Sequence, residues 1–308
     1  MRFVSTAAMT GASQSEQLRA AFEIGAHSLN FVSLETEEAD GYVIQRLAFV
    51  TGDGEAVRGV LTRPLGSGPF PAVLYIHAHG DRYDIGADEL LDGRPALLGP
   101  LGPVFARMGF VTLAIEMPAF GSRAVPDESA RAKAALWHGR SVAGQMVAEQ
   151  QAAFAWLAAR DDVIADRIGV FGLSMGATLG YWLAAVEPRV TCVAHLCCYA
   201  DFDSLIGTGA HDLHGIYLTV PGLLGIASNG TIAGLIAPRP QLIAVGDRDP
   251  LTPPAAVDRA LAQTWDAYAC AGAPAALTLI REPDTGHVET EAMRAGVLAF
   301  FERYLDGA

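Results

Sequence analysis

The 308-residue chain has little of what marks a membrane protein or a nucleic-acid-binding protein. No stretch approaches the roughly 20 apolar residues that a membrane helix requires. The most apolar long run, residues 218–227, is short and is interrupted by Pro221 and two glycines. Basic residues are also scarce, with 21 Lys and Arg against 34 Asp and Glu. Because nucleic acid requires a basic surface, the net charge of −13 argues against such a partner.

Cysteine is rare too, and the chain begins without a targeting pattern. Arg2 is followed by no continuous apolar stretch, and charged residues arrive early, so we expect no signal peptide and a cytoplasmic protein. None of the cysteines forms a C-x-x-C pair, and three fall in one apolar run that predicts a buried strand. We therefore expect reduced thiols in the core. The four are Cys192, Cys197, Cys198 and Cys270.

The composition that remains is that of an ordinary globular chain, with half of its residues apolar. Its length suits one large α/β domain, and we expect a single domain over residues 1–308. We expect a helical lead-in over about residues 1–40, with its helix over residues 14–31. Two alternating runs, Tyr42–Thr51 and Ala56–Arg63, flank the turn Gly52-Asp53-Gly54 and predict a β-hairpin.

After the hairpin, apolar strand-like runs alternate with helical ones. This alternation predicts a mainly parallel central sheet with helices on both faces. Residues 200–236 interrupt it with seven glycines and look like a cap-like insertion. The strands are expected at residues 71–77, 109–115, 167–171, 190–199, 241–245 and 276–280. The helices are expected at residues 98–108, 129–160, 177–185, 254–271 and 291–304.

One pentapeptide carries most of the functional signal. Residues 172–176 read Gly-Leu-Ser-Met-Gly, after an apolar, β-branched run and before an alanine-rich helical stretch. A serine at the apex of a tight strand-to-helix turn is the nucleophile elbow of α/β-hydrolases. The turn presents the hydroxyl of Ser174 at the top of the sheet, and the helix N-terminus faces the negative charge that develops there.

A serine hydroxyl is a weak nucleophile that needs a base and a group to orient that base. In this fold the chain order is serine, acid, histidine. Asp249 follows the strand ending at residue 245, and His287 lies on the loop after the next strand. These positions predict His287 as the base and Asp249 as the acid. Asp247 and Asp201 also follow strands, and they remain alternatives for the acid.

A tetrahedral intermediate requires two backbone donors. One is expected from Met175, the residue after the nucleophile, and the other from His79, with Asp81 as the alternative. The run His77-x-His79-x-Asp81 also looks like part of a dinuclear metal motif, but its sixth residue is Arg82 rather than histidine. We therefore expect no metal and no cofactor, and we interpret His77 as a structural residue hydrogen-bonded below the site.

Further segments over about residues 70–290 together resemble one group of bacterial esterases. The chain resembles the dienelactone hydrolase-like, acetyl xylan esterase-related α/β-hydrolases, and the resemblance implies cofactor-free ester hydrolysis through an acyl-enzyme. Dienelactone hydrolases proper carry a cysteine nucleophile where this chain has Ser174, and Ala78 replaces an expected glycine. The matching segments are His77–Gly80, Glu116–Arg123, His138–Ser141, Asp166–Gly176, Val220–Leu224, Ile236–Pro240 with Asp249, and Gly286-His287.

The sequence therefore predicts a serine carboxylesterase with a small-molecule ester substrate and no nucleic-acid or membrane partner. An amidase, a C–C hydrolase or a perhydrolase would use the same triad, and a non-catalytic binding protein of this fold is the alternative of another class. The apolar residues of the insertion are expected to form an acyl-pocket wall or cap, or else to pack on a helix or on a second subunit of a homodimer. They are Tyr217, Leu218, Leu223 and Leu224.

Overall fold

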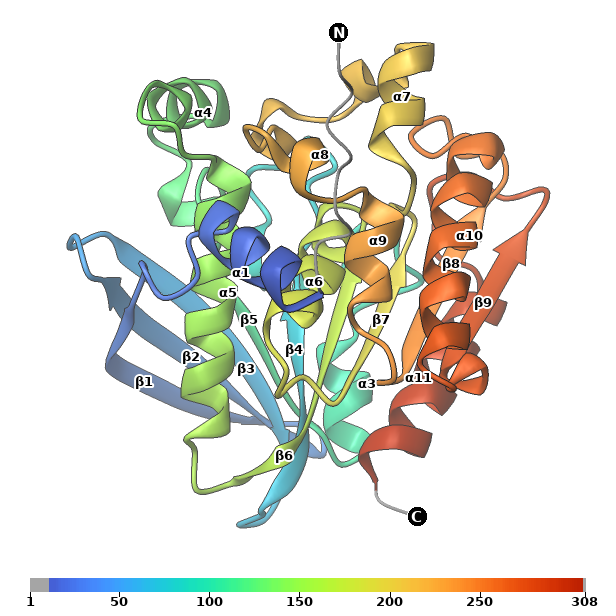
Figure 1. The fold of residues 1–308 in the computed structure, drawn as a ribbon. Helices are drawn as coiled ribbons and strands as arrows, with labels where there is room; N and C mark the ends of the chain where they lie inside the picture. Colours follow the sequence, from blue (N-terminus) through green and yellow to red (C-terminus); the bar gives the residue numbers. More distant parts are fainter. Residues whose placement is uncertain (1–10, 307–308) are drawn as a thin grey trace, which may run out of the picture.

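The computed structural model describes residues 11–306, and over this range the chain folds around one nine-stranded sheet (Figure 1). The spatial order of the strands is β1-β2-β3-β5-β4-β6-β7-β8-β9. Their bounds are β1 Leu29–Ala39, β2 Tyr42–Thr51, β3 Ala56–Pro64, β4 Phe70–Ile76, β5 Val111–Ile115, β6 Val163–Leu173, β7 Cys192–Leu196, β8 Gln241–Gly246 and β9 Leu277–Glu282.

The first strands pair antiparallel, from β1 through β2 and β3 to β5. From β5 onward every neighbour is parallel. The predicted hairpin and the mainly parallel sheet are both confirmed. The carboxyl ends of β4, β6, β7, β8 and β9 consequently meet at one edge, where open α/β sheets place their sites.

Helices cover both faces of the sheet, as predicted (Figure 1). On one face, residues of α1, α5, α6, α9 and α10 share a buried apolar core with the strands. On the other face, α3 and α11 pack with the strands in a second core. The helices are α1 Gly11–Ala21, α2 Glu89–Asp92, α3 Gly102–Arg107, α4 Glu128–Trp137, α5 Val142–Ala158, α6 Met175–Val186, α7 Phe202–Thr208, α8 Leu223–Ile226, α9 Asn229–Gly234, α10 Pro254–Cys270 and α11 Glu291–Leu305.

The predicted helical lead-in over residues 1–40 is wrong in its second half. Helix α1 ends at Ala21, and residues 29–39 form the edge strand β1. Because β1 pairs only with β2 and is exposed over most of its length, its side chains lack the burial pattern that would have marked a strand. Residues 1–10 lie outside the described part of the chain.

The other differences concern the number and length of the helices. The expected helix over residues 129–160 is two helices, α4 and α5, separated where Gly139 adopts a φ of 68°. The expected helix over residues 98–108 is only the six-residue α3. The insertion 200–236 is not irregular throughout, because it contains α7, α8 and α9. Figure 1 shows α7 and α8 at the same end of the molecule as α4.

Candidate active site

Ser174 lies between the last residue of β6 and the first residue of α6. Its backbone conformation is one that residues other than glycine rarely adopt. Its φ is 57° and its ψ is −119°. The flanking positions leave no space for side chains. A Cβ on Gly172 would lie 2.0 Å from the Gly176 carbonyl oxygen, and one on Gly176 would lie 1.9 Å from the Ile76 carbonyl oxygen. Both glycines are therefore required by this close packing, which keeps the turn tight.

The three predicted triad residues meet at the carboxyl edge of the sheet. The Oγ atom of Ser174 lies 2.8 Å from Nε2 of His287, and Nδ1 of His287 lies 2.6 Å from Oδ2 of Asp249. The second oxygen of Asp249 accepts the N–H of Leu251 at 2.9 Å. A neutral His287 that donates from Nδ1 to this carboxylate presents an unprotonated Nε2 to the serine hydroxyl.

The two alternative acids are occupied elsewhere. Asp247 accepts a hydrogen bond from Arg281 at 2.7 Å. Asp201 caps the N-terminus of α7, where it accepts the N–H of Ser204 at 2.9 Å, and it lies 3.2 Å from Arg259. Neither carboxylate contacts the ring of His287 among the hydrogen bonds of residues 11–306, so Asp249 is the one of these three aspartates that is hydrogen-bonded to His287.

The two predicted backbone donors follow β6 and β4, which are neighbouring parallel strands whose carboxyl ends lie at the same edge of the sheet. Met175 is the first residue of α6, and His79 follows β4. Within residues 11–306 neither N–H has a hydrogen-bond acceptor. The next two residues after His79, Gly80 and Asp81, both have positive φ, at 54° and 53°. This loop therefore has an unusual conformation that its neighbours must hold in place.

The backbone of this loop is bound by an ion pair between the fully buried Glu89 and the largely buried side chain of Arg94. The carboxylate of Glu89 accepts the N–H of Ala78 at 3.1 Å and the hydroxyl of Tyr75 at 2.7 Å. Arg94 pairs with this carboxylate and donates to the carbonyl of Ala78 at 2.8 Å. Burial raises the pKa of the Glu89 carboxyl above its ordinary value, although these donors oppose the shift. Both polar groups of the Ala78 backbone are consequently fixed.

The structure places His77 beneath the site, in the position expected of a structural residue. Its Nε2 accepts the N–H of Met117 at 3.2 Å, and its Nδ1 donates to the carbonyl of Ala78 at 3.1 Å. Burial lowers the pKa of His77 to about 3, so the ring is neutral. His79 turns instead toward Glu128. Among residues 11–306 no three His, Cys, Asp or Glu side chains are grouped so that they could hold a metal ion.

The insertion contains a cavity of about 490 Å³ beside the loop that carries Asp249. His214 connects the two, because its Nε2 donates to the carbonyl of Leu251 at 3.0 Å. Burial lowers the pKa of His214 below its ordinary value. Tyr217 does not line this cavity but stacks on the ring of His79, with centroids 5.1 Å apart. The lining includes Leu218, Leu223 and Leu224, together with Phe202, Leu205, Ile206, Ile216 and Val220.

Sequence reasoning missed two polar residues near the site, Glu128 and His214. Glu128 follows Asp127 at the start of α4, and acidic residues there are typical of any helix N-terminus. His214 lies in the insertion, outside every motif named in the sequence analysis. Neither carried a signal of its position, because each depends on contacts with segments distant in sequence.

Three of the four cysteines are core thiols, as expected, and the fourth is not. Cys192, Cys197 and Cys198 are buried and unoxidised, whereas Cys270 is exposed. Burial raises the pKa of the Cys198 thiol to about 12, which keeps it protonated and unreactive. The helices of residues 11–306 include none with the length and apolar character needed to cross a membrane.

Comparison with known proteins places this geometry in a family. The sequence model of the dienelactone hydrolase family matches residues 101–204. The Bacillus subtilis (strain 168) protein named "Putative hydrolase YtaP" is 35% identical over 279 residues, which cover 89% of this chain and 93% of that protein.

Solved structures support the same fold. A "putative acetyl xylan esterase" from Bacteroides fragilis NCTC 9343 superimposes with a TM-score of 0.71 and 17% identity, over 96% of this chain and 82% of that one. An acetyl xylan esterase from Paenibacillus sp. R4 superimposes with a TM-score of 0.68 and 19% identity, over 97% of this chain and 96% of that one. The predicted fold and resemblance are both confirmed: the chain belongs to the dienelactone hydrolase-like family of α/β-hydrolases.

Proposed function

We propose that this protein is a serine carboxylesterase that hydrolyses small acyl esters through an acyl-enzyme intermediate. The observation that carries the proposal is the unbroken line of hydrogen bonds from Ser174 through His287 to Asp249, built on a strained elbow. A binding protein has no need of a base aligned on a serine hydroxyl. The names of the similar structures, which are esterases, support the same reaction class.

In the proposed reaction, Oγ of Ser174 attacks the ester carbonyl while Nε2 of His287 takes the hydroxyl proton. The resulting oxyanion is held by the N–H groups of Met175 and His79, which have no other acceptor among residues 11–306. When the intermediate collapses, the C–O bond to the alcohol breaks, and the alcohol leaves with the proton from His287.

The acyl-enzyme is then hydrolysed by the same groups. His287 takes a proton from water, and the hydroxide attacks the acyl carbonyl of the serine ester. The second intermediate collapses, and Ser174 leaves with the proton that His287 returns. Throughout, the buried carboxylate of Asp249 orients the ring and stabilises the imidazolium. Each proton moves on a protein group or water, so the mechanism requires no cofactor.

The cavity of the insertion is the proposed place for an apolar part of the ester. Its wall of leucines faces a volume larger than an acetyl group requires, and His214 joins it to the Asp249 loop. We therefore expect esters with several carbons in one arm to be accepted alongside acetyl esters.

The experiment that tests the function is a screen of p-nitrophenyl esters from acetyl to dodecanoyl, run on the wild type and on Ser174→Ala. We expect turnover by the wild type and a loss on the order of 10⁴- to 10⁶-fold in kcat in the variant. A fluorophosphonate probe should label only the wild type. If the wild type neither hydrolyses these esters nor reacts with the probe, the esterase proposal is wrong and a binding role gains support.

A further inference from the structure

The imidazole of His79 is held on several sides, although the proposed reaction uses only its backbone N–H. Its Nδ1 accepts the N–H of Asp81 at 3.1 Å, which leaves the proton on Nε2. That Nε2 donates to Oε2 of Glu128 at 2.5 Å. Tyr217 stacks on one ring face, and Phe120 lies edge-on at 5.3 Å. The side chain is therefore held within the loop after β4, whose His79 N–H is the second oxyanion donor proposed above.

Glu128 is the group on which this arrangement converges. Besides His79, its carboxylate accepts the hydroxyl of Tyr83 at 3.1 Å and the N–H of Tyr217 at 3.3 Å. The residue is buried, and these hydrogen bonds lower the pKa of its carboxyl even though burial acts to raise it. All three partners donate hydrogen bonds, so this position requires a group that only accepts them. An ionised carboxylate is such a group.

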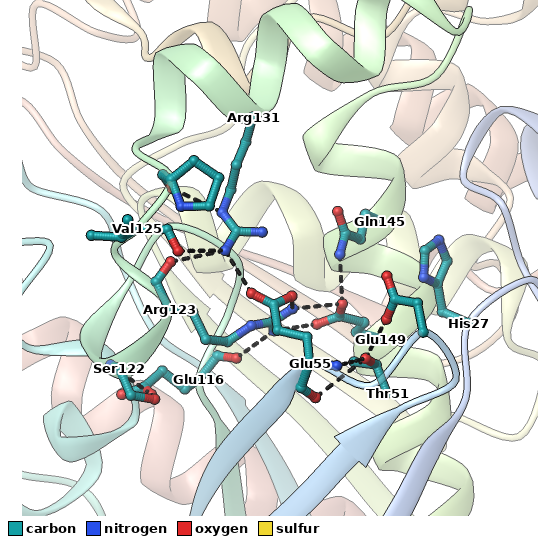
Figure 2. Close-up of polar contacts among 12 residues, drawn as sticks. His27, Thr51, Glu55, Glu116, Ser122, Arg123, Val125, Arg131, Gln145 and Glu149 are labelled. Carbon is teal, nitrogen blue, oxygen red and sulfur yellow. Dashed lines mark hydrogen bonds and ion pairs between the residues drawn. The ribbon is translucent and has the colours of Figure 1, made fainter.

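Helix α4, which carries Glu128, has a second and separate anchor. Arg131 donates to Glu55 at 2.5 Å, and Glu55 also accepts from the buried Arg123 at 2.6 Å (Figure 2). Arg123 in turn donates to Glu149 of α5. Figure 2 shows this cluster joining α4, α5 and the β2–β3 turn. The helix is therefore held in place independently of the contact between Glu128 and His79.

We propose that Glu128 is a positioning residue for the ester hydrolysis assigned above, acting through the side chain of His79 to set the backbone N–H that holds the oxyanion. The inference rests on the proposed function, because it assigns His79 the role of an oxyanion donor. It also connects the insertion to the chemistry, since Tyr217 donates to the same carboxylate.

The test is Glu128→Gln, which keeps the shape of the side chain but replaces one carboxylate oxygen with an NH₂ group. That NH₂ donor then faces one of the donors that Glu128 accepts from, which are His79, Tyr83 and Tyr217. A donor displaced by about 1 Å can cost on the order of 100-fold in rate, so we expect kcat to fall about 10- to 100-fold with KM little changed. The affinity for benzeneboronic acid, whose serine adduct places an oxygen in the same hole, should fall by a similar factor. Arg131→Gln is the matched control, because it removes the other anchor of α4 and leaves His79 untouched.

A double-mutant cycle shows whether Glu128 acts through His79. His79→Gln retains the backbone N–H but loses the ring, so adding Glu128→Gln to it should cost less than about threefold more. Equal losses in Glu128→Gln and Arg131→Gln, or independent losses in the cycle, would overturn the proposal. They would mean that Glu128 merely holds α4.

A second readout needs no turnover. In protein labelled with ¹⁵N only at histidine, the amide resonance of His79, identified by its loss in His79→Gln, should move in Glu128→Gln and stay in Arg131→Gln. If the wild type proves inactive, the esterase proposal fails, and this resonance alone decides whether Glu128 sets the loop. If the His79 resonance does not move in Glu128→Gln, Glu128 does not set the loop. The unfolding temperature of the variant shows whether the variant is folded when this comparison is made.

Discussion

At the scale of single residues, the site depends on which carboxylate reaches the histidine. Three aspartates follow neighbouring strands, and the chain order of the fold admits more than one of them. Only Asp249 has an oxygen at 2.6 Å from Nδ1 of His287, while its other oxygen is satisfied by the backbone. Asp247 and Asp201 are engaged by arginines and a helix N-terminus.

Asp249→Asn should therefore lower kcat by about 10⁴-fold and change KM little. The amide can donate to Nδ1, which favours the ring tautomer that cannot accept the serine proton. Asp247→Asn is the control, because it removes a partly exposed ion pair, and its kcat should remain within a few-fold of wild type. Steady-state kinetics on one p-nitrophenyl ester decides the matter. A larger loss in Asp201→Asn than in Asp249→Asn would reassign the acid.

At the scale of elements, helices α7 and α8 of the insertion help to line the cavity that His214 connects to the Asp249 loop. Leu223 and Leu224 belong to α8, and both line the cavity. Ile226 is on the same helix but does not line the cavity. Substitution of Leu223 or Leu224 therefore tests a substrate contact, and substitution of Ile226 tests for a general effect on α8.

Leu224→Ala should shift the preferred acyl chain length upward and leave kcat for short esters mostly intact, because it removes three carbon atoms from the cavity wall. The profile of kcat/KM against chain length, from acetyl to dodecanoyl, measures this shift. Ile226→Ala should leave the profile unchanged. If Leu223→Ala and Leu224→Ala also leave it unchanged, the segment has a structural or interface role.

A second element-scale contact ties the segment after α1 to the loop before α5. Glu23 accepts from Arg140 at 2.7 Å and from His27 at 3.1 Å. Burial acts to raise the pKa of the Glu23 carboxyl, but these partners lower it from 4.5 to about 2. Since the folded pKa lies below the unfolded one, the stabilisation is present above pH 4.5 and is lost as pH falls toward 2.

Glu23→Gln should therefore destabilise the protein at neutral pH, and less so in acid. Because the Arg140 side chain is half exposed and water screens the pair, we expect a loss of about 1 kcal/mol in the free energy of unfolding. Denaturant titrations of both proteins at pH 7, 5, 4 and 3 measure it. The difference should shrink below pH 4.5, and a difference that grew toward pH 3 would contradict the assignment.

At the scale of the whole molecule, the parts that sequence predicted are those whose residues are buried on both faces. The apolar runs of β4, β5, β6 and β8 identify the parallel sheet, and its carboxyl edge then follows from topology. The exposed edge strand β1 has no such pattern, and its residues fall within the predicted helical lead-in. The helices of the insertion were missed because four to seven residues are too few to show a helical period.

The candidate site divides in the same way. Ser174 and His287 follow from motif and chain order, because the fold places both at strand ends. The choice among the aspartates depends on His287, which is 38 residues from Asp249. The position of Glu128 depends on His79, which is 49 residues away. No local sequence pattern predicts either contact. Long-range hydrogen bonds of this kind become visible only when the segments are packed together.

The central claim is that Ser174 carries the acyl group during turnover. Its most direct test is intact-mass and peptide mass spectrometry after brief reaction with a slowly deacylating p-nitrophenyl ester, followed by an acid quench. The account predicts one acyl mass added per chain, located on the peptide that contains Ser174 and absent in Ser174→Ala. An acyl group on another residue, or ester turnover by Ser174→Ala at a tenth or more of the wild-type kcat, would contradict it.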